Sequence, residues 1–346
     1  MALLAISALL AALTITDNAN LIVIYLVTIV GATVGAVATP TRQALVPLLV
    51  PRREMAGAMT MNILGSQMSA VGGPAVGGLI ISQWGLAAAY SIDALSFVAV
   101  IAAVIAMRTR PETPVHLLGG WAAALEGLRF LRASPILLGI MSIDFIATFF
   151  GASTVLMPIF ATEILGVGPS GLGLLLAAPA AGAVLGSAVM SIAHMPARPG
   201  RGVLIAVVAY GACMLGFGLS RTFLISILWL IGSGAADAVS MALRHTVRNL
   251  ATPDALRGRV AAAHTTFAAG GPQLGEFEAG AVAALVDAGT SVTLGGASTI
   301  LAAAFVAWRV PAIARYRTVR ESTDVPPPRD AGSRQRGPPV EDVLTE

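Results

Sequence analysis

Apolar residues fill long, nearly unbroken runs of this 346-residue chain, and short clusters of Gly, Pro and charged residues separate the runs. A bilayer core of about 30 Å is crossed by about 20 apolar residues in a helix, which satisfies its own backbone polar groups in lipid. The pattern therefore predicts an all-α membrane protein. Its ten expected spans are 1–16, 21–39, 60–83, 88–107, 136–160, 170–193, 203–219, 222–243, 259–286 and 290–309.

Two polar stretches divide the chain further. Between the fourth and fifth spans, apolar residues recur at helical spacing, at Trp121, Leu125, Leu128 and Leu131, which predicts an amphipathic helix on the inner leaflet. The C-terminal stretch is rich in Pro, Arg and acidic residues, a composition typical of disorder. We therefore expect an incomplete N-terminal bundle, a cytoplasmic connector, a C-terminal six-helix bundle and a disordered cytoplasmic tail, at 1–107, 108–135, 136–310 and 311–346.

Composition and charge agree with this topology. With 56% hydrophobic and only 11% charged residues, the chain cannot cover a water-soluble globule with polar side chains. All its basic residues are arginine, and Arg221 alone falls on the opposite side of the expected membrane from the others. The positive-inside rule then predicts cytoplasmic termini, and the Arg-, Ala- and Gly-rich composition points to a bacterial inner membrane. Topology thus explains the net charge of +3, and no nucleic-acid partner is expected.

The chain contains an internal repeat. A shift of 202 positions places "TRQALVPLLVPRREMAGAM" on "LRHTVRNLATPDALRGRVA", so that Arg42 meets Arg244. The helix breaks near 17–20, 40–58 and 84–87 fall on those near 219–222, 242–260 and 286–289. Duplicated halves of this kind are common in membrane transporters, and Arg42 and Arg244 are expected in matching cytoplasmic loops.

The opening "MALLAISALLAALT" is interpreted through the same repeat. It has no basic segment in front of it, which disfavours a signal peptide. Met1 matches Val203, the start of the third span of the second half, so the segment is expected to be an interior helix. The first half would then lack two helices, about 67 residues by the separation of positions 136 and 203.

Several motifs support a family resemblance. The segment "GSQMSAVGGPAVGG" (65–78), which begins at Gly65, resembles the antiporter motif of the major facilitator superfamily. The segments "EGLRFLRASP" (126–135) and "ATPDALRGRVAA" (251–262) look like the branch that holds enterobactin exporters and macrolide efflux proteins. The resemblance covers about 1–310 and implies two six-helix bundles, of which four plus six helices are present here. It also implies a monomeric, proton-driven exporter of small molecules.

The chain departs from the family pattern at a loop that acts as a gate latch. The Gly- and Arg-rich loop expected between the second and third helices would be absent together with the first two helices. Its counterpart in the second half, "HMPARPGRG" (194–202), keeps Arg198, Gly200 and Arg201 without the usual acidic partner. Arg198 and Arg201 are therefore expected in a cytoplasmic loop.

The glycine motif has a physical interpretation of its own. Gly73 and Gly77 lie four residues apart and expose backbone on one helix face, beside Gly78, while Pro74 removes a hydrogen bond and bends the helix. Two roles remain open: a bend at the interface where the halves rock, or tight static packing.

Ionisable residues within the spans are candidates for function. An embedded charge costs about 2.5–3.5 kcal/mol near a helix centre. Asp144 lies about nine residues, or roughly 14 Å, into its span and is the main candidate for proton coupling, with capping or pairing as the alternative. Asp237 either pairs with Arg244 or faces the substrate cavity.

Three further titratable residues lie in the long span 259–286. Glu276 and Glu278 lie toward its outer end, where a substrate-facing or proton-releasing role and a solvated-rim role are both open. His264 either titrates near neutral pH or forms an interfacial hydrogen bond.

The sequence gives little support for a metal site, an enzyme or a bound cofactor. His116, His194 and His245 are expected in cytoplasmic loops without ligand spacing, so no metal is expected. The chain has no G-x-S-x-G or H-E-x-x-H motif, and a phosphate loop ending in Lys is impossible without lysine. Neither an enzyme nor a cofactor is expected.

The preferred hypothesis is efflux of a hydrophobic or amphiphilic small molecule, such as a siderophore or drug, by alternating access with proton antiport. The alternative is a truncated, non-transporting remnant or a membrane scaffold of the same fold.

Overall fold

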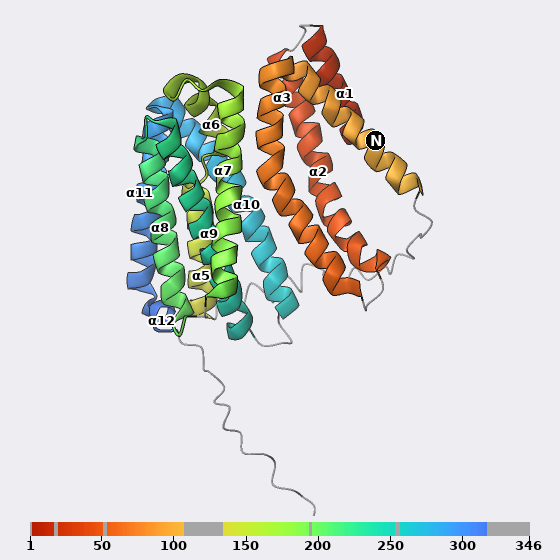
Figure 1. Cartoon of the computed structure of the whole chain (residues 1–346). Coiled ribbons are helices and arrows are strands. Elements are labelled where there is room, and N and C mark those ends of the chain that lie inside the picture. The colour runs from red at the N-terminus through yellow and green to blue at the C-terminus, as the bar shows by residue number, and fades with distance from the viewer. Residues whose placement is uncertain are drawn as a thin grey trace, which may run out of the picture.

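The described part of the chain is built from helices, and no strand occurs within it. A computed structural model describes residues 2–16, 20–50, 54–106, 134–193, 196–252 and 257–316 (Figure 1). The predicted connector helix lies outside the described residues, as does the tail beyond residue 316.

The N-terminal helices are α1 (Ala2–Ile15), α2 (Leu21–Leu49) and α3 (Met55–Ala106). Asn20 caps α2 by accepting a hydrogen bond from the backbone N–H of Ile22. The long α3 is broken at Gly85, whose φ of 81° is accessible to glycine without steric cost. The expected spans 60–83 and 88–107 are the two arms of this broken helix. α1 is tied to the second arm by a hydrogen bond from the Ser7 hydroxyl to the Asp93 carboxylate.

The C-terminal helices begin with a broken segment, made of α5 (Pro135–Phe150), the 3₁₀ turn η2 (Thr154–Leu156), α6 (Met157–Ile159) and the π-helical turn η3 (Phe160–Ile164). They continue with α7 (Gly168–Ile192), α8 (Pro199–Leu219), α9 (Phe223–Ala251), α10 (Arg257–Leu285), α11 (Ala288–Arg309) and α12 (Pro311–Arg315). Proline in the first turn of α5, α7, α8 and α12 starts each helix where a missing N–H costs nothing.

The expected span 136–160 is not one continuous helix, because α5 ends at Phe150. The break frees the carbonyl of Gly151, which accepts a hydrogen bond from the Tyr210 hydroxyl at 2.9 Å. Broken helices persist at membrane depth where a neighbouring helix satisfies the freed backbone group. Tyr210 of α8 meets that condition here.

Close backbone approach holds the C-terminal helices together. Gly182 and Gly186 of α7 lie against the backbone of Ile231 and Ala235 in α9, so a Cβ at either glycine would clash. Small residues at this spacing allow the tight contacts on which helix association in lipid depends. The pair is also one of the Gly-x-x-x-Gly spacings visible in the sequence, and here it packs helices within one bundle.

The helix bounds agree with the internal repeat. Shifted by 202 positions, α2 covers 223–251, which are the bounds of α9. The same shift moves the start of α3 to Arg257, where α10 begins, and moves Gly85 onto Asp287, between α10 and α11.

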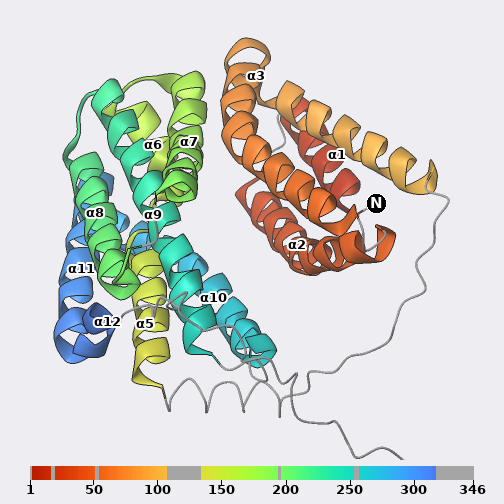
Figure 2. The ribbon, with the colours of Figure 1, turned by 60° about the horizontal axis from the view of Figure 1, so that its bottom comes forward.

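The two groups of helices meet where α3 lies beside α7, as Figures 1 and 2 show. A Cβ at Gly78 would lie 2.6 Å from the Pro169 carbonyl oxygen and 2.8 Å from the Gly173 Cα. No described atom lies within 4 Å of a Cβ at Gly65, Gly73 or Gly77. The close approach is therefore made by Gly78, and not by the pair Gly73 and Gly77 that the sequence favoured.

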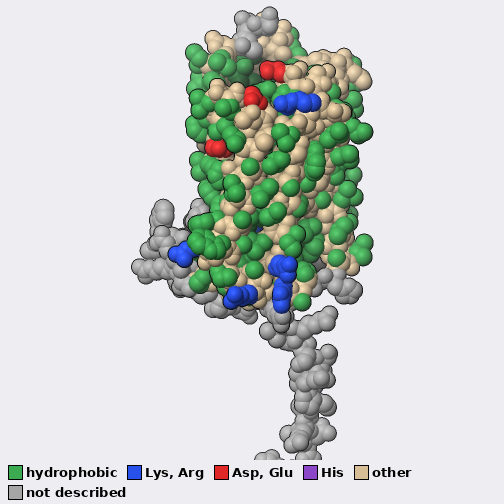
Figure 3. Space-filling model, turned by 90° about the vertical axis from the view of Figure 1, so that its left-hand side faces the viewer, with side chains coloured by type: hydrophobic (Ala, Val, Ile, Leu, Met, Phe, Trp, Pro, Cys, Tyr) green, Lys and Arg blue, Asp and Glu red, His purple; other side chains and the backbone are tan. Residues whose placement is uncertain are grey.

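Six stretches of the described residues are long and apolar enough to cross a membrane: 64–106, which holds both arms of α3, 135–164, 168–192, 199–219, 223–251 and 288–309. Two shorter apolar helices cover Ala2–Ile15 and Leu21–Gly35. Hydrophobic side chains cover the middle of the face in Figure 3, and arginines gather at its lower end. The chain is an all-α, multi-pass membrane protein.

Two expectations about elements need correction. α10 covers the expected span 259–286 as far as Leu285, but it is not among the six described stretches that are apolar enough to cross a membrane, because it carries His264, Gln273 and two glutamates. The segment expected to be a disordered tail begins with α12, which is held in place because Ile313 is fully buried against α8.

Candidate functional site

One face of α9 carries three charged residues and a methionine. Asp237, Met241, Arg244 and Arg248 follow each other at intervals of four, three and four, the spacing of one helical face. Arg244 and His245 were expected in a cytoplasmic loop, and this prediction is wrong. The helix continues to Ala251 because no Gly or Pro occurs between 235 and 252, and charged residues end an apolar run without ending a helix.

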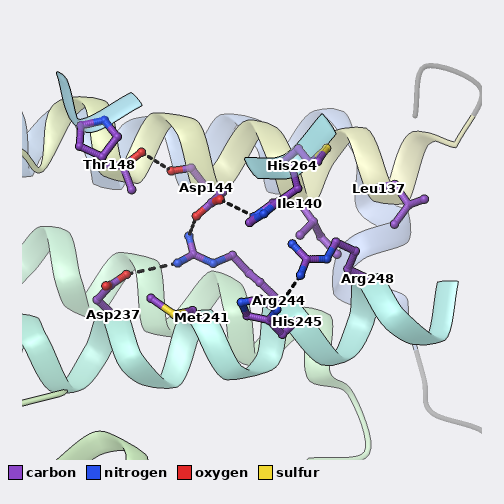
Figure 4. Close-up of a pocket in the computed structure, with 12 residues that line it drawn as sticks. Leu137, Ile140, Asp144, Thr148, Asp237, Met241, Arg244, His245, Arg248 and His264 are labelled. Atoms are coloured by element: carbon purple, nitrogen blue, oxygen red, sulfur yellow. Dashed lines mark hydrogen bonds and ion pairs between the residues drawn. The ribbon is translucent and has the colours of Figure 1, made fainter. Parts of the chain in front are cut away.

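Arg244 lies between two aspartates, as Figure 4 shows. Its Nη1 is 2.6 Å from Oδ1 of Asp144 in α5, a close ion pair without the alignment of a hydrogen bond. Its Nη2 donates to Oδ1 of Asp237 at 3.2 Å. The side chains of Arg244 and Asp144 are only 6% and 14% exposed, so both charges depend on each other for compensation.

His264 completes the cluster from a third helix. Its Nε2 in α10 lies 3.0 Å from Oδ2 of Asp144. Both carboxylate oxygens of Asp144 are therefore engaged, one by α9 and the other by α10 (Figure 4). We name Asp144, Asp237, Arg244 and His264 the charge cluster.

Two carboxylates of the charge cluster face the guanidinium of Arg244, and Arg248 of the same helix lies within electrostatic reach of Asp144. The carboxylates and the guanidinium groups are therefore equal in number, so each negative charge at membrane depth has a positive charge nearby.

Two residues that the sequence analysis did not select lie beside the cluster. Nη2 of Arg248 lies 2.6 Å from Nδ1 of His245, and the ring centroids of His245 and His264 are 6.0 Å apart. The signal that would have found them is the spacing on α9, because both lie within two turns of Arg244 on the same helix.

A cavity of about 350 Å³ lies against the cluster, and we name it the Arg244 cavity. Its apolar walls come from Leu137, Ile140 and Met141 of α5 and Met241 of α9. Its polar groups are the charge cluster together with Thr148, His245 and Arg248. Apolar walls with a few convergent polar groups are typical of a small-molecule site.

A second cavity of about 360 Å³, the Tyr210 cavity, is lined by Ser153, Tyr210, Ser233 and Glu276 among others. Thr148, Asp237 and Pro272 line both cavities, so the two lie on either side of these residues. On α9 the lining runs from Leu230 to Arg248, which is about 27 Å of helix. This length is close to the thickness of the bilayer core, about 30 Å.

The other candidate residues are dispersed. Glu276 lines the Tyr210 cavity, whereas Glu278 lines neither cavity. Arg198 precedes α8 and Arg201 lies in its first turn, both exposed, so only Arg198 lies outside a helix. Arg42, expected in a loop, falls within α2, which continues to Leu49. The glycine motif lies on α3, away from the charge cluster on α5, α9 and α10.

Comparison with known proteins identifies the family of this chain. A model described as "transmembrane secretion effector" (MFS_3) matches residues 1–340. The chain belongs to this major facilitator family. Membership places it among membrane transport proteins and not among enzymes.

Relatives of the MFS_3 chain include proteins named enterobactin exporter EntS from Shigella boydii serotype 18, Escherichia coli O81 and Escherichia coli O139:H28. Each is 26% identical to this chain over 277 residues, which are 80% of this chain and 66% of the relative. The match therefore covers slightly less than two thirds of the length of these curated relatives.

Proposed function

We propose that this MFS_3 protein exports a hydrophobic or amphiphilic small molecule, of siderophore or drug type, by alternating access coupled to proton antiport. The observation that carries the proposal is the position of Asp144. Its carboxylate joins α5 to α9 and α10 inside a cavity that a small molecule can enter. The name of the EntS relatives supports a siderophore-like substrate.

Proton exchange at Asp144 would act on helix contacts. When Asp144 is charged, it attracts Arg244 and His264, and the three helices are held together at that level. A proton on Asp144 removes the negative charge that both partners face, so the links weaken and α9 and α10 are released from α5. Unit charges about 4 Å apart interact by about 4 kcal/mol at an effective dielectric of about 20, which is enough to bias two conformations.

The substrate would use the same groups. Arg244 and Arg248 offer guanidinium donors to an acidic or hydroxyl group of the substrate, and Ile140, Met141 and Met241 contact its apolar part. A hydroxyl or cationic group of the same substrate would donate to the Asp144 carboxylate, which then cannot hold a proton, so substrate binding releases the proton from Asp144. Competition for one cluster is the simplest basis for antiport.

The proposal includes a topology. The arginine-rich end, with Arg198, Arg201 and Arg315, faces the cytoplasm of a bacterial inner membrane, and both termini lie there. The N-terminal and C-terminal bundles rock against each other about the contact between Gly78 and Gly173. The monomer is the transporting unit.

The test uses the full chain in sealed proteoliposomes with an imposed proton gradient. Enterobactin and the amphiphilic cation ethidium serve as probes, and collapse of the gradient by an ionophore is the reference. We expect gradient-dependent movement of at least one probe by the wild type and none by Asp144→Asn. Asp287→Asn, the same change at a capping residue far from the cluster, is the matched control and should transport normally. If Asp144→Asn transports a probe as well as the wild type does, the cluster takes no part in proton coupling. If the wild type transports neither enterobactin nor ethidium, the proposed substrate class is contradicted.

A further inference from the structure

A third hollow lies on the outer surface of the C-terminal bundle, away from the charge cluster. It has a volume of about 520 Å³ and runs between α8, α11 and α12. Its walls are apolar, from Leu204, Ile205 and Val208 of α8 and Ala304 and Ala307 of α11. We name it the α8–α11 groove.

Three arginines surround one end of the groove. Arg198 and Arg201 come from the start of α8, and Arg315 comes from the end of α12. All three are exposed, and none of them forms an ion pair with any residue in the part of the chain that the structure describes. No acidic side chain is among the described residues that line the groove. The groove thus combines apolar walls with three arginines whose charge no acidic side chain of the described residues compensates.

Helix packing brings the three arginines together. α12 follows α11 after Val310 and is anchored by Ile313, which is fully buried against Gly200. A Cβ at Gly200 would clash with the Ile313 backbone, so the first turn of α8 and α12 lie in close contact. Arg315 is thereby brought beside Arg198 and Arg201, which are more than a hundred residues away in the chain.

The groove lies on the lipid-facing side of the bundle. α8 and α11 are on the side opposite α3 (Figure 1), and the face they form is covered with hydrophobic side chains, with arginines at its lower end (Figure 3). The basic end of the groove is therefore at the level of lipid headgroups, and its apolar part is at the level of acyl chains.

We propose that the α8–α11 groove is a binding site for an anionic glycerophospholipid. The three guanidinium groups bind the phosphate, because arginine donates paired hydrogen bonds to phosphate oxygens. The apolar walls hold an acyl chain along α8 and α11. A free phosphate ion would use the arginines but not the groove, so the continuity of the two favours a lipid. Basic pockets between membrane helices are known to recognise lipid headgroups in this way.

The test measures lipid binding to the purified full-length chain in detergent by native mass spectrometry, during titration with phosphatidylglycerol. Phosphatidylcholine and inorganic phosphate are the comparison ligands. Each arginine near a membrane surface contributes about 1 kcal/mol of attraction, so the triple variant Arg198→Gln, Arg201→Gln, Arg315→Gln should bind phosphatidylglycerol roughly a hundredfold more weakly. Arg309→Gln, an exposed arginine of the same end that does not line the groove, should bind as the wild type does.

A second variant tests the apolar part without changing any charge. Ala304→Trp fills the groove and should displace phosphatidylglycerol, whereas Leu301→Trp, an exposed position one turn earlier outside the lining, should not. The single variant Arg201→Gln, expected to bind about fivefold more weakly, covers the case in which the triple variant does not fold. Undiminished binding by Arg201→Gln and Ala304→Trp would overturn the site. Equal competition by inorganic phosphate, with no effect of Ala304→Trp, would show an anion site and refute the lipid assignment.

Discussion

Arg244 lies 2.6 Å from one carboxylate and 3.2 Å from another, with almost no exposure to solvent. Its pairing with Asp237 follows from a spacing of seven residues on one helix, and it was one of the two roles that the sequence left open for Asp237. Its contact with Asp144 joins residues 100 positions apart, and His264 is 120 positions from Asp144. No periodicity in the sequence reports such tertiary contacts, so the sequence marked Asp144, Asp237 and His264 separately but not as one cluster.

The asymmetry of the charge cluster predicts an order of stabilities. Arg244→Gln leaves two carboxylates without their shared cation, whereas Asp144→Asn leaves Arg244 still paired with Asp237. Removing one partner of a buried pair costs about 3–5 kcal/mol, so Arg244→Gln should lower the melting temperature in detergent clearly more than Asp144→Asn. Arg309→Gln, an exposed arginine, should change stability by less than about 0.5 kcal/mol. Equal melting temperatures for the two cluster variants would show that Asp237 does not compensate Arg244.

Asp287 gives a prediction about pH outside the membrane. The hydroxyl and backbone N–H of Thr290 donate to its carboxylate and hold the pKa of Asp287 below its usual range. Because the folded-state pKa is lowered, its stabilisation of the α11 N-terminus is present above the ordinary aspartate pKa and is lost as pH falls through the lowered value. Thr290→Val removes one of these donors, so it should lower the melting temperature at neutral pH and reduce the further loss between neutral and acid pH, as measured by melting temperature against pH. If Thr290→Val and the wild type show the same melting temperatures at every pH, the hydroxyl of Thr290 contributes nothing to stability.

At the scale of elements, the decisive contact is the crossing of α3 and α7. The sequence identified the glycine motif as an interface, because small residues at intervals of four allow close approach. It did not show which glycine makes the contact, because that depends on the rotation of α3 toward its neighbour. The structure places Gly78 against Pro169 and Gly173, and leaves Gly73 without a described neighbour within 4 Å.

Two alanine substitutions separate these positions. In a helix interior, Ala is favoured over Gly by about 0.8–1.0 kcal/mol of intrinsic helix propensity. Gly73→Ala should therefore stabilise the protein. At Gly78 the new Cβ would lie 2.6 Å from the Pro169 carbonyl, and backbone there cannot rotate away. Overpacking costs about 1–3 kcal/mol, so Gly78→Ala should be destabilising in thermal unfolding of the full chain. A stabilising effect at both positions would mean that the α3–α7 crossing is looser than described.

Helix ends were the least predictable feature of the elements. The ten expected spans all correspond to described helices, because long apolar runs report burial in lipid directly. The apolar run of the eighth span stops at 243, but α9 continues to Ala251, and this extension carries Arg244, His245 and Arg248 into the site. The break after Phe150 was also missed, because the Tyr210 hydroxyl that satisfies it comes from another helix.

At the scale of the whole molecule, the repeat relates the two groups of helices. α2 and α9 have equivalent bounds at a separation of 202, and Arg42 of α2 occupies the position that matches Arg244. The charge cluster nevertheless has no counterpart in α2, because Gly35 occupies the position that matches Asp237 and supplies no carboxylate. The helix bounds are thus repeated, and the described residues of the proposed coupling site all lie in the C-terminal bundle.

The central claim is that a substrate and a proton compete for the charge cluster. The most direct measurement is proton release or uptake when substrate binds to the purified full chain in weakly buffered detergent solution, followed with a pH-sensitive dye. Our account predicts a proton signal that saturates with the binding of enterobactin or ethidium, and a variant Asp144→Asn that binds the same probe without the signal. Binding by the wild type with no proton exchanged, or an unchanged signal in Asp144→Asn, would contradict the account.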